Sequence, residues 1–387
     1  MRTYERTHPW INFTLDLRKA SFKLFLMLGE AQSKCQHIIG IPLMPRVAEE
    51  FNKIYLAKGA MATTAIEGNT LTENEVLERI DGKRTLPPSR EYLGQEIDNI
   101  IEAYKYIQKR MLNEKITEIT VEDIRAYNKI VLKNLPLNNE ITPGEIRSHK
   151  VGVGNYLGAP PEDCEYLLTK LCEWLNAENE FPKEYKIVFG IIKAIFTHLN
   201  IAWIHPFGDG NGRTARLMEL QSLLSVGIPA TTVHLLSNHY NQTRAEYYRQ
   251  LEVSHKLKDG IFSFMEYALQ GFIDGLKEQI DLVKLQQLSV HWTNYIHDMF
   301  RDKNSPADVR QRRLVLDLSK DEKPVPISKI NRISARIAEA YANKTYKTVT
   351  RDINALITMG LVEKKGKEIR AKKEIIQAFL PQTINES

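Results

Sequence analysis

Apolar residues recur every three or four positions along most of the first 300 residues, which is the spacing that places them on one face of an α-helix. Glycine, proline and capping residues divide this pattern into separate segments. The pattern predicts a mostly α fold, with helices at 15–39, 47–66, 91–112, 120–132, 166–176, 185–203, 214–226, 241–256 and 262–281.

Two stretches stand apart from this amphipathic pattern. The most apolar one runs from Val188 to Phe207, but it is interrupted by Lys193, His198, Asn200 and His205, so we expect a buried core helix rather than a membrane span. Residues 146–156 are strand-like and contain Val151-Gly152-Val153. They predict a short β-hairpin or extended flap.

The last fifth of the chain differs in both charge and order of elements. Residues 333–341 and 348–359 predict two short helices around a turn, and 361–370 alternates about Gly366 as a hairpin does. Residues 301–387 contain 19 Lys and Arg against 11 Asp and Glu, whereas the whole chain carries a net charge of only +5. Any polyanionic partner is therefore expected to bind this end.

This order of two helices and a basic hairpin resembles the winged helix-turn-helix of bacterial regulators. The resemblance implies that Thr348, Thr350 and Arg351, at the start of the second helix, would face DNA bases, and that Lys365 in the hairpin would touch phosphate. Winged helices also mediate protein contacts. DNA binding and a protein-interaction or regulatory role are therefore both open.

The composition is that of an ordinary soluble globular protein, with 43% hydrophobic and 26% charged residues. It excludes collagen-like, wholly disordered and disulfide-scaffold classes. Cys35, Cys164 and Cys172 cannot all pair and form no CxxC motif, so we expect free thiols in a reducing compartment. No apolar run follows the first charged residues, so we expect no signal peptide and a cytoplasmic protein.

The segment from Ile204 to Arg216 carries the densest chemistry of the chain. Glycines at 208, 210 and 212 precede a helical run, where backbone N–H groups and the helix dipole favour an anion. Arg213 and Arg216 lie on one face of that helix start, which is unfavourable for cations unless a polyphosphate lies among them. Asp209 offers the oxygen ligand that Mg²⁺ prefers, and His205 is a candidate general base. Together they indicate a polyphosphate site.

The residues from His205 to Arg213, with Arg216, fit every position of the HxFx(D/E)GNGRxxR signature of the Fic domain family. The resemblance extends over about residues 90–275. It implies a helical core with a flap and a protein adenylyltransferase that moves AMP from ATP to a Ser, Thr or Tyr hydroxyl of a target protein or of itself. Some relatives transfer phosphocholine or act as kinases. The intact Gly210-Asn211-Gly212 favours transfer of AMP from ATP over these alternatives.

The resemblance also assigns a role to each signature residue. His205 would deprotonate the target hydroxyl, and Asp209 would hold Mg²⁺ against the α- and β-phosphates. Gly210, Asn211 and Gly212 would cradle the phosphates. Arg213 would bind the β-phosphate side and Arg216 the γ-phosphate. An extended target segment would pair with the flap main chain at Val151, Gly152 and Val153.

A second segment matches the (S/T)xxxE(G/N) inhibitory motif of the same family, at Thr63, Glu67 and Gly68. Glu67 lies in the last turn of a predicted helix, where the dipole disfavours a carboxylate. The resemblance implies that Glu67 pairs with Arg216 and denies ATP a productive γ-phosphate position. In some relatives this Glu positions a water and supports removal of AMP. The sequence leaves both roles open.

These observations predict four parts: an N-terminal helical region with the inhibitory motif (1–90), a Fic catalytic core (91–280), a helical linker (281–305) and a winged helix-turn-helix (306–387) that folds alone. The expected partners are ATP, Mg²⁺ and a target protein and, through the last part, either DNA or another protein. Fic relatives often dimerise, so the resemblance leaves a homodimer open, and no membrane is expected. The alternative function is a DNA-binding regulator whose Fic domain senses nucleotide.

Overall fold

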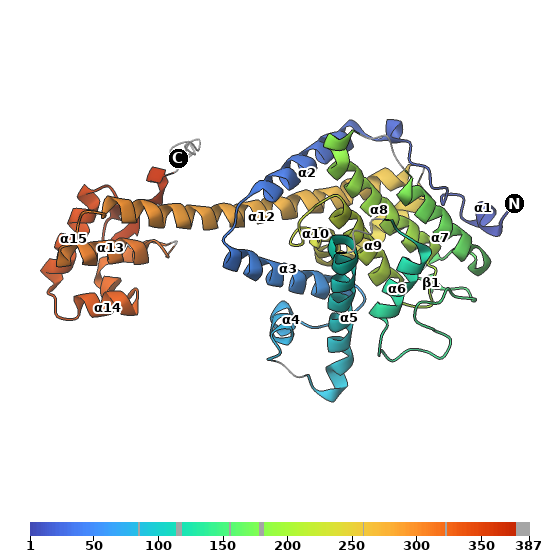
Figure 1. Cartoon of the computed structure of the whole chain (residues 1–387), viewed down its shortest axis with the longest axis horizontal. Helices are drawn as coiled ribbons and strands as arrows, with labels where there is room; N and C mark the ends of the chain where they lie inside the picture. Colours follow the sequence, from blue (N-terminus) through green and yellow to red (C-terminus); the bar gives the residue numbers. More distant parts are fainter. Residues whose placement is uncertain are drawn as a thin grey trace. The chain divides into compact units, whose positions relative to one another are not determined.

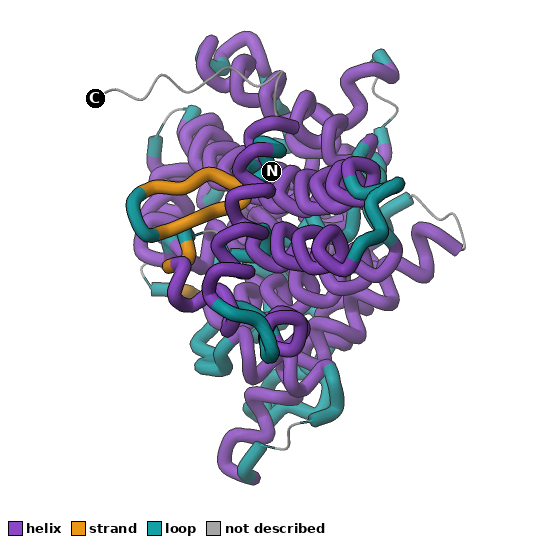
Figure 2. Tube along the Cα trace, turned by 90° about the vertical axis from the view of Figure 1, so that its left-hand side faces the viewer, coloured by secondary structure: helices purple, strands orange, loops and turns teal. Residues whose placement is uncertain are grey.

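The computed structural model describes residues 1–83, 86–113, 118–154, 156–177, 182–257, 259–321 and 323–376. The chain divides into two units, Met1–Ile280 and Asp281–Ser387 (Figure 1). Helix α12 (Gly260–Met299) begins in the first unit and ends in the second. Both units are mostly helical with few strands, as the apolar spacing predicts (Figure 2).

The first unit packs its helices around one apolar core. Side-chain caps fix several of the starts: Ser21, Thr72 and Thr120 each accept a hydrogen bond from a backbone N–H three residues further on. The cap at Ser21 also explains why α2 begins at Phe22, later than the start at residue 15 that the sequence predicts. The helices before α12 are α1 (Thr3–Thr7), α2 (Phe22–Gly40), α3 (Pro45–Ala65), α4 (Glu73–Ile80), α5 (Glu91–Gln108), α6 (Val121–Val131), α7 (Pro161–Asn176), α8 (Lys186–Ile204), α9 (Asn211–Ser225), α10 (Leu235–Gln242) and α11 (Arg244–Lys256).

Helix α8 runs through the centre of this unit and packs against α9. By length and composition, Lys183–Ile204 could cross a membrane, but 78% of its most apolar window is buried inside the protein. It is the core helix predicted for 188–207. Because α8 is buried, its C-terminal end is a fixed platform for the loop that follows it.

The predicted flap is a two-stranded antiparallel hairpin of β1 (Gly152–Val153) and β2 (Tyr156–Leu157). Gly152 pairs with Leu157 and Val153 with Tyr156. The predicted strand-like stretch also includes Asn155, which lies outside the described residues. A single bridge between Ile146 and Phe207 ties the approach to this hairpin to the loop after α8.

The second unit contains α13 (Pro306–Leu318), α14 (Ala335–Tyr341), α15 (Tyr346–Thr358) and a three-stranded antiparallel sheet. Its strands lie in the order β3 (Val325–Pro326), β5 (Glu368–Ala371) and β4 (Val362–Lys365). The helices α14 and α15 and the β4–β5 hairpin lie where the sequence predicts them. Helix α13 and strand β3 add to this predicted arrangement.

The division into parts differs from the predicted one at 281–305. This stretch is not only a linker, because Trp292, Ile296 and Phe300 on α12 are buried in the apolar core of the second unit. A fragment that starts at 306 would lack all three, so the expectation that it folds alone does not fit this core. The N-terminal 1–90 segment likewise packs into the same core as 91–280.

Asp352 holds the helices of the second unit together from a fully buried position. Its Oδ2 accepts hydrogen bonds from Nε of Arg310 (3.0 Å) and from the hydroxyl of Tyr341 (3.1 Å), and its Oδ1 accepts one from Gln311 (3.2 Å). These partners come from α13 and α14. A buried charge with this many partners is stable only as a complete set.

Candidate active site

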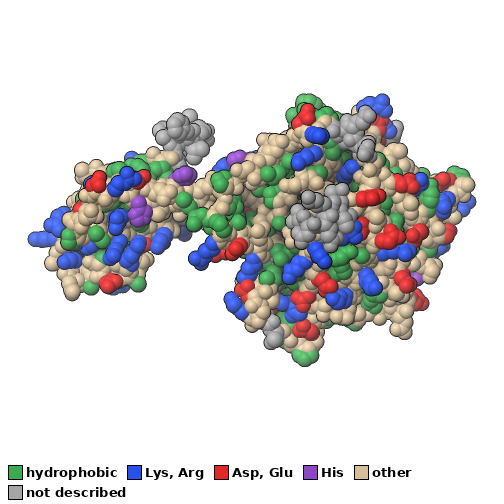
Figure 3. Space-filling view, in the orientation of Figure 1, with side chains coloured by type: hydrophobic (Ala, Val, Ile, Leu, Met, Phe, Trp, Pro, Cys, Tyr) green, Lys and Arg blue, Asp and Glu red, His purple; other side chains and the backbone are tan. Residues whose placement is uncertain are grey.

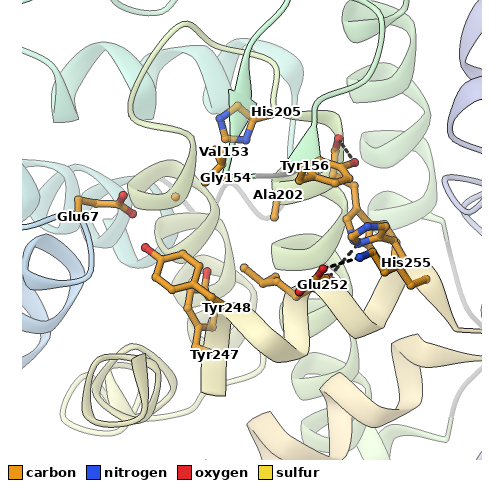
Figure 4. A pocket seen from close by; sticks show the side chains of 14 residues that line it. Glu67, Val153, Gly154, Tyr156, Ala202, His205, Tyr247, Tyr248, Glu252 and His255 are labelled. Carbon is orange, nitrogen blue, oxygen red and sulfur yellow. Dashed lines mark hydrogen bonds and ion pairs between the residues drawn. The ribbon is translucent and has the colours of Figure 1, made fainter. Parts of the chain in front are cut away.

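His205 is the first residue after α8 and has a left-handed backbone, with φ 50° and ψ 58°. This conformation costs on the order of 1–3 kcal/mol for a residue with a side chain. Two hydrogen bonds hold it: the His205 N–H donates to the carbonyl of Ile201 (2.9 Å), and the His205 carbonyl accepts from Nε of Arg147 (2.6 Å). The strained turn brings the imidazole to the edge of a cavity (Figure 4).

Arg147 organises the backbone around His205 from a buried position. Besides the His205 carbonyl, its guanidinium donates to the carbonyls of His149 (2.6 Å), Ala159 (2.6 Å) and Ile204 (3.3 Å). These four acceptors lie on both sides of the flap and at the end of α8. Arg147 therefore fixes the flap and the catalytic histidine candidate to one another.

The signature loop is shaped by its own side chains. Gly210, with φ 77°, precedes the first turn of α9. The buried amide of Asn211 accepts from the N–H of Phe207 (2.9 Å) and donates to the Phe207 carbonyl (2.8 Å). Since this side chain is engaged within the loop, Asn211 can offer a phosphate its backbone N–H.

Asp209 is the carboxylate of the loop, and its side chain is 45% exposed. Its Oδ1 accepts from the N–H of Gly210 (2.5 Å) and from Nη2 of Arg213 (3.2 Å). Among the described residues, no group of three or more His, Cys, Asp or Glu side chains could hold a metal ion. A cation here would therefore need phosphate or water oxygens beside Asp209.

Arg213 and Arg216 are both buried near the N-terminus of α9, and each faces a carboxylate from another element. Nη1 of Arg213 lies 3.1 Å from Glu96 on α5. Nη2 of Arg216 lies 2.6 Å from Oε1 of Glu67 and donates to the carbonyl of Thr63 (2.9 Å). Within the described part of the chain, Nε of both arginines and Nη1 of Arg216 have no hydrogen-bond partner.

Glu67 covers the N-terminus of α9. A Cβ on Gly212 would collide with the Glu67 carboxylate and would lie 3.2 Å from Nη1 of Arg216. The missing side chain at Gly212 is what lets the carboxylate enter. Gly68, with φ 106°, follows Glu67 in a left-handed conformation that favours glycine. Glu67 thus occupies the place where a helix N-terminus binds an anion.

The ionisation of both key groups follows from their surroundings. Burial raises the pKa of Glu67, but the charge and the hydrogen bond of Arg216 together lower it by more than burial raises it. The net pKa of Glu67 therefore lies below its ordinary value. Burial lowers the pKa of His205 to about 4, and the opposing effects of the Ala202 backbone, Glu67 and Asp209 are smaller. At neutral pH, Glu67 is charged and the imidazole is neutral and able to accept a proton.

The cavity beside His205 has a volume of about 470 Å³, within the range of ligand pockets. Glu67 lies at one end of it and Tyr156 and His255 at the other, with His205 between them (Figure 4), and Gly212 also lines the cavity. The aromatic and apolar walls between these ends leave room for more than a phosphate group. The remaining lining residues are Val153, Gly154, Ala202, Trp203, Tyr247, Tyr248, Leu251, Glu252 and Lys256.

The flap is anchored from behind by side chains and by the N-terminal segment. The hydroxyl of Tyr156 donates to the carbonyl of Trp203 (2.7 Å), two residues before His205. Nε2 of His8 lies 2.9 Å from the carbonyl of Leu157. The ring of Trp10 lies 6.5 Å from that of Tyr156. The opposite surface, at Gly152 and Val153, is exposed, and Val151 is half-buried.

The candidate DNA contacts lie in the second unit. Arg351 and Lys365 are exposed, whereas Thr348 and Thr350 on α15 are half-buried. The Thr350 hydroxyl donates to the carbonyl of Tyr346 (3.1 Å). Figure 3 shows Lys and Arg side chains gathered on this unit.

The structure thus brings together His205, the glycine loop, both arginines and Glu67 in one site, although they come from segments far apart in the sequence. Sequence reasoning missed the roles of Glu96, Arg147 and Tyr156. Arg147 lies just before the flap, but no pattern marks it as the residue that holds four carbonyls. Glu96 looks like any polar position on an amphipathic helix.

Comparison with known proteins concerns the part of the chain that contains this site. Residues 118–223 match the Fic/DOC family. The chain is 30% identical over 233 residues to protein adenylyltransferase fic-1 of Caenorhabditis elegans, which covers 60% of this chain and 42% of that protein. It is 30% identical over 231 residues to protein adenylyltransferase Fic of Nematostella vectensis, covering 58% and 49%. The matches thus span less than half the length of these curated relatives.

Solved structures agree on the fold. A Fic family protein from Desulfovibrio desulfuricans G20 is similar with a TM-score of 0.56 at 20% identity, over 91% of this chain and 96% of that chain. A fragment of Fic-1 from C. elegans is similar with a TM-score of 0.55 at 23% identity, over 68% and 73%. The chain therefore contains a Fic domain and is a homologue of the Fic protein adenylyltransferases.

Proposed function

We propose that this protein is a protein adenylyltransferase that moves AMP from ATP to a hydroxyl group of a protein side chain. The observation that carries the proposal is that one cavity joins a neutral imidazole, His205, to a helix N-terminus flanked by two buried arginines. The arginines and the backbone N–H groups of α9 suit a polyphosphate. The imidazole suits a proton acceptor. Homologues named protein adenylyltransferase support this reading.

In the proposed reaction the hydroxyl oxygen of the target attacks the α-phosphorus of ATP. A new P–O bond forms to the target, and the bond between the α-phosphorus and the α–β bridging oxygen breaks. The hydroxyl proton passes to the imidazole of His205, and pyrophosphate leaves. Arg213 and Arg216 would stabilise the charge on the leaving group, so catalysis rests on positioning and on charge stabilisation.

Asp209 suits a Mg²⁺ ion that is coordinated mainly by phosphate and water oxygens rather than by protein side chains alone. The carboxylate is partly exposed, and one of its oxygens is already used by Gly210 and Arg213. Mg²⁺ is commonly held by one or two carboxylates together with phosphate oxygens and water. Asp209 would hold the ion there, and the ion would neutralise charge on the α- and β-phosphates.

Glu67 would inhibit the transfer by competing for Arg216. The carboxylate already lies on the guanidinium that the γ-phosphate would need, and it fills the space above Gly212. A Glu67 that instead positions a water would support removal of AMP. The two roles share the same geometry, and they differ in whether AMP-modified protein loses its label when the enzyme is added.

Incubation of the whole protein with α-³²P-ATP, Mg²⁺ and cell lysate tests the function. We expect protein-bound label with Glu67→Gly, and none when His205→Ala is added to it, because the base is then missing. ATP binding should persist in the His205→Ala variant. Label that does not depend on His205, or no label with Glu67→Gly on any protein, would contradict the proposal.

A second candidate function concerns the basic second unit, which would bind DNA through α15 and the β4–β5 hairpin. The observation that favours it is the exposure of Arg351 together with the hairpin lysines 364, 365 and 367. Binding of a DNA duplex by the whole protein should then weaken steeply as the salt concentration rises, because Lys and Arg side chains that bind phosphate groups release the counterions of those groups. Arg351→Ala should weaken it. Binding that does not depend on salt, or no binding, leaves a protein-interaction role for this unit.

A further inference from the structure

Each signature arginine pairs with one carboxylate from outside the signature loop, and Arg213 also pairs with Asp209 within that loop. Only one of the two carboxylates from outside the loop belongs to the inhibitory motif. Glu67 holds Arg216, whereas Arg213 is held by Glu96, which lies on α5. The side chain of Glu96 is 17% exposed, so this carboxylate is largely removed from water. A carboxylate in such a place is stable only with partners for both of its oxygens.

The second carboxylate oxygen of Glu96 is hydrogen-bonded to the inhibitory segment, residues 63–69. Its Oε2 accepts a hydrogen bond from Nδ2 of Asn69 (2.8 Å), while its Oε1 faces Arg213. The same amide nitrogen of Asn69 donates to the carbonyl of Leu93 (2.9 Å), and its Oδ1 accepts from the N–H of Leu71 (3.0 Å). Asn69 is buried and lies two residues after Glu67. Asn69 therefore fixes the chain directly after Glu67 to α5 through its hydrogen bonds to Leu93 and Glu96.

We propose that Glu96 is a positioning residue that couples the inhibitory segment, residues 63–69, to Arg213. One carboxylate oxygen serves the arginine and the other serves the anchor of the segment. A polyphosphate that draws Arg213 toward itself takes one partner from Glu96, and this loosens the set of bonds that fixes Asn69. Because such coupling is reciprocal, release of Glu67 from Arg216 also favours binding at Arg213. The proposal rests on the proposed function for its effect on transfer.

Glu96→Gln tests this coupling because it keeps the size of the side chain. A carboxylate can accept from two donors, whereas an amide has one acceptor oxygen and an NH₂ group. The substituted amide would therefore turn a donor toward either Arg213 or Asn69. We expect transfer to rise about 3- to 10-fold, the effect of weakening one or two hydrogen bonds. Asn69→Ala should give a similar rise, although it leaves Glu96 beside Arg213.

The dependence on Glu67 separates coupling from a merely structural effect. In a Glu67→Gly background neither Glu96→Gln nor Asn69→Ala should raise transfer further, because there is no carboxylate left to release. Glu102→Gln is the matched control, since Glu102 lies on the same helix, is 48% exposed and forms a surface pair with Lys133. An equal rise in the Glu67→Gly background, or no effect of Asn69→Ala, would overturn the coupling.

A second measurement does not need the transfer activity. Hydrogen exchange of the backbone amides of residues 66–71 reports the anchor directly, since the N–H of Asn69 donates to the carbonyl of Thr64 (3.1 Å). We expect this segment to exchange about 3- to 10-fold faster in Glu96→Gln than in Glu102→Gln. Equal exchange in the two variants would refute the coupling. Loss of transfer in every variant, with the exchange difference present, would instead refute the adenylyltransferase function.

Discussion

Glu67 and Arg216 form an asymmetric pair: the side chain of Glu67 is 33% exposed, whereas that of Arg216 is 1% exposed. The guanidinium is also fixed by the carbonyl of Thr63, 2.9 Å away. The carboxylate is therefore the partner that can leave, because it alone has water to move into. Its departure would leave a buried cation above an open helix N-terminus, which is the arrangement that a polyphosphate stabilises.

Removal of the carboxylate should therefore activate the protein. We expect Glu67→Gly to raise AMP transfer about 10- to 100-fold, since the charge-assisted hydrogen bond that it removes is worth about 1.5–3 kcal/mol. The rate of incorporation of label from α-³²P-ATP measures this.

The gain should depend on the arginine rather than on looser packing of α3. Addition of Arg216→Ala to Glu67→Gly should abolish it, because the γ-phosphate then has no guanidinium to bind. If the double variant kept the gain, Glu67 would act through the stability of its helix and not through Arg216.

Arg147 should be essential for the geometry around His205, although it lies outside the signature. Arg147→Lys keeps the charge but loses the planar fork that reaches four carbonyls. We expect the free energy of unfolding to fall by about 2–4 kcal/mol, since at least two of these bonds are lost in a buried place. The value of kcat should fall by about tenfold or more as the imidazole shifts.

Urea unfolding and steady-state kinetics measure these two effects. Arg249→Lys is the control, because Arg249 is 59% exposed and pairs with Glu246 on the surface. A loss of stability without any loss of kcat would separate Arg147 from the positioning of His205.

The parts of this site that the sequence predicted share one property: their chemistry requires fixed residue types at fixed spacing. A helix N-terminus that binds phosphates needs glycines before it, and this need is visible at 208–212. Glu67 and Gly68 were found in the same way, because the inhibitory motif also fixes residue types at fixed spacing.

Glu96 and Arg147 act through contacts that only the tertiary fold creates, and this is why the sequence could not reveal them. Glu96 lies 117 positions from Arg213 in the chain, yet they form an ion pair. The packing of α12 was missed for a similar reason: the spacing of Trp292, Ile296 and Phe300 shows a helix but not the core that the helix joins. Apolar periodicity specifies a buried face and leaves its partner open.

The pH dependence should reveal the burial of His205. Its pKa is lowered to about 4, whereas the unfolded side chain titrates at about 6.5. The unfolded state therefore binds the extra proton first as the pH falls, and the stability contributed by the neutral buried imidazole is lost between about pH 6.5 and pH 4. His205→Gln should lack this component.

The free energy of unfolding should be measured across this pH range for the wild type and for His205→Gln. The difference between the two gives the contribution of His205 alone, because His234, whose pKa is also lowered to about 4, is present in both proteins. The acid limb of kcat/KM in the Glu67→Gly variant should also lie below about pH 6.5, since this ratio reports the free enzyme. A limb near the ordinary histidine value would mean that the imidazole is solvated.

Asp352 should control the stability of the second unit alone. Asp352→Ala leaves Arg310 without its buried partner, and such a loss usually costs about 3–5 kcal/mol. We expect the melting transition of the second unit to move to lower temperature while AMP transfer at room temperature persists. Asp298→Ala, at a 63% exposed surface pair, should change neither.

Tyr156 should decide how well a target segment docks. Its hydroxyl donates to the carbonyl of Trp203 and so fixes strand β2 to the end of α8. Tyr156→Phe keeps the ring packing against His8 and Trp10 but removes this bond. The exposed edge of the flap would then move relative to His205, so we expect the KM for the target protein to rise about 2- to 10-fold, the effect of one hydrogen bond. The dissociation constant for ATP should stay the same, because Glu67 and Gly212 line the opposite end of the cavity and are untouched. Tyr185→Phe, at a 50% exposed position, is the matched control.

Kinetics with varied target at saturating ATP give the KM for the target, and ATP titration calorimetry gives the dissociation constant for ATP, so the two effects of Tyr156→Phe can be separated. A rise in the dissociation constant for ATP without a rise in KM for the target would mean that Tyr156, which lines the cavity, positions the nucleotide rather than the flap.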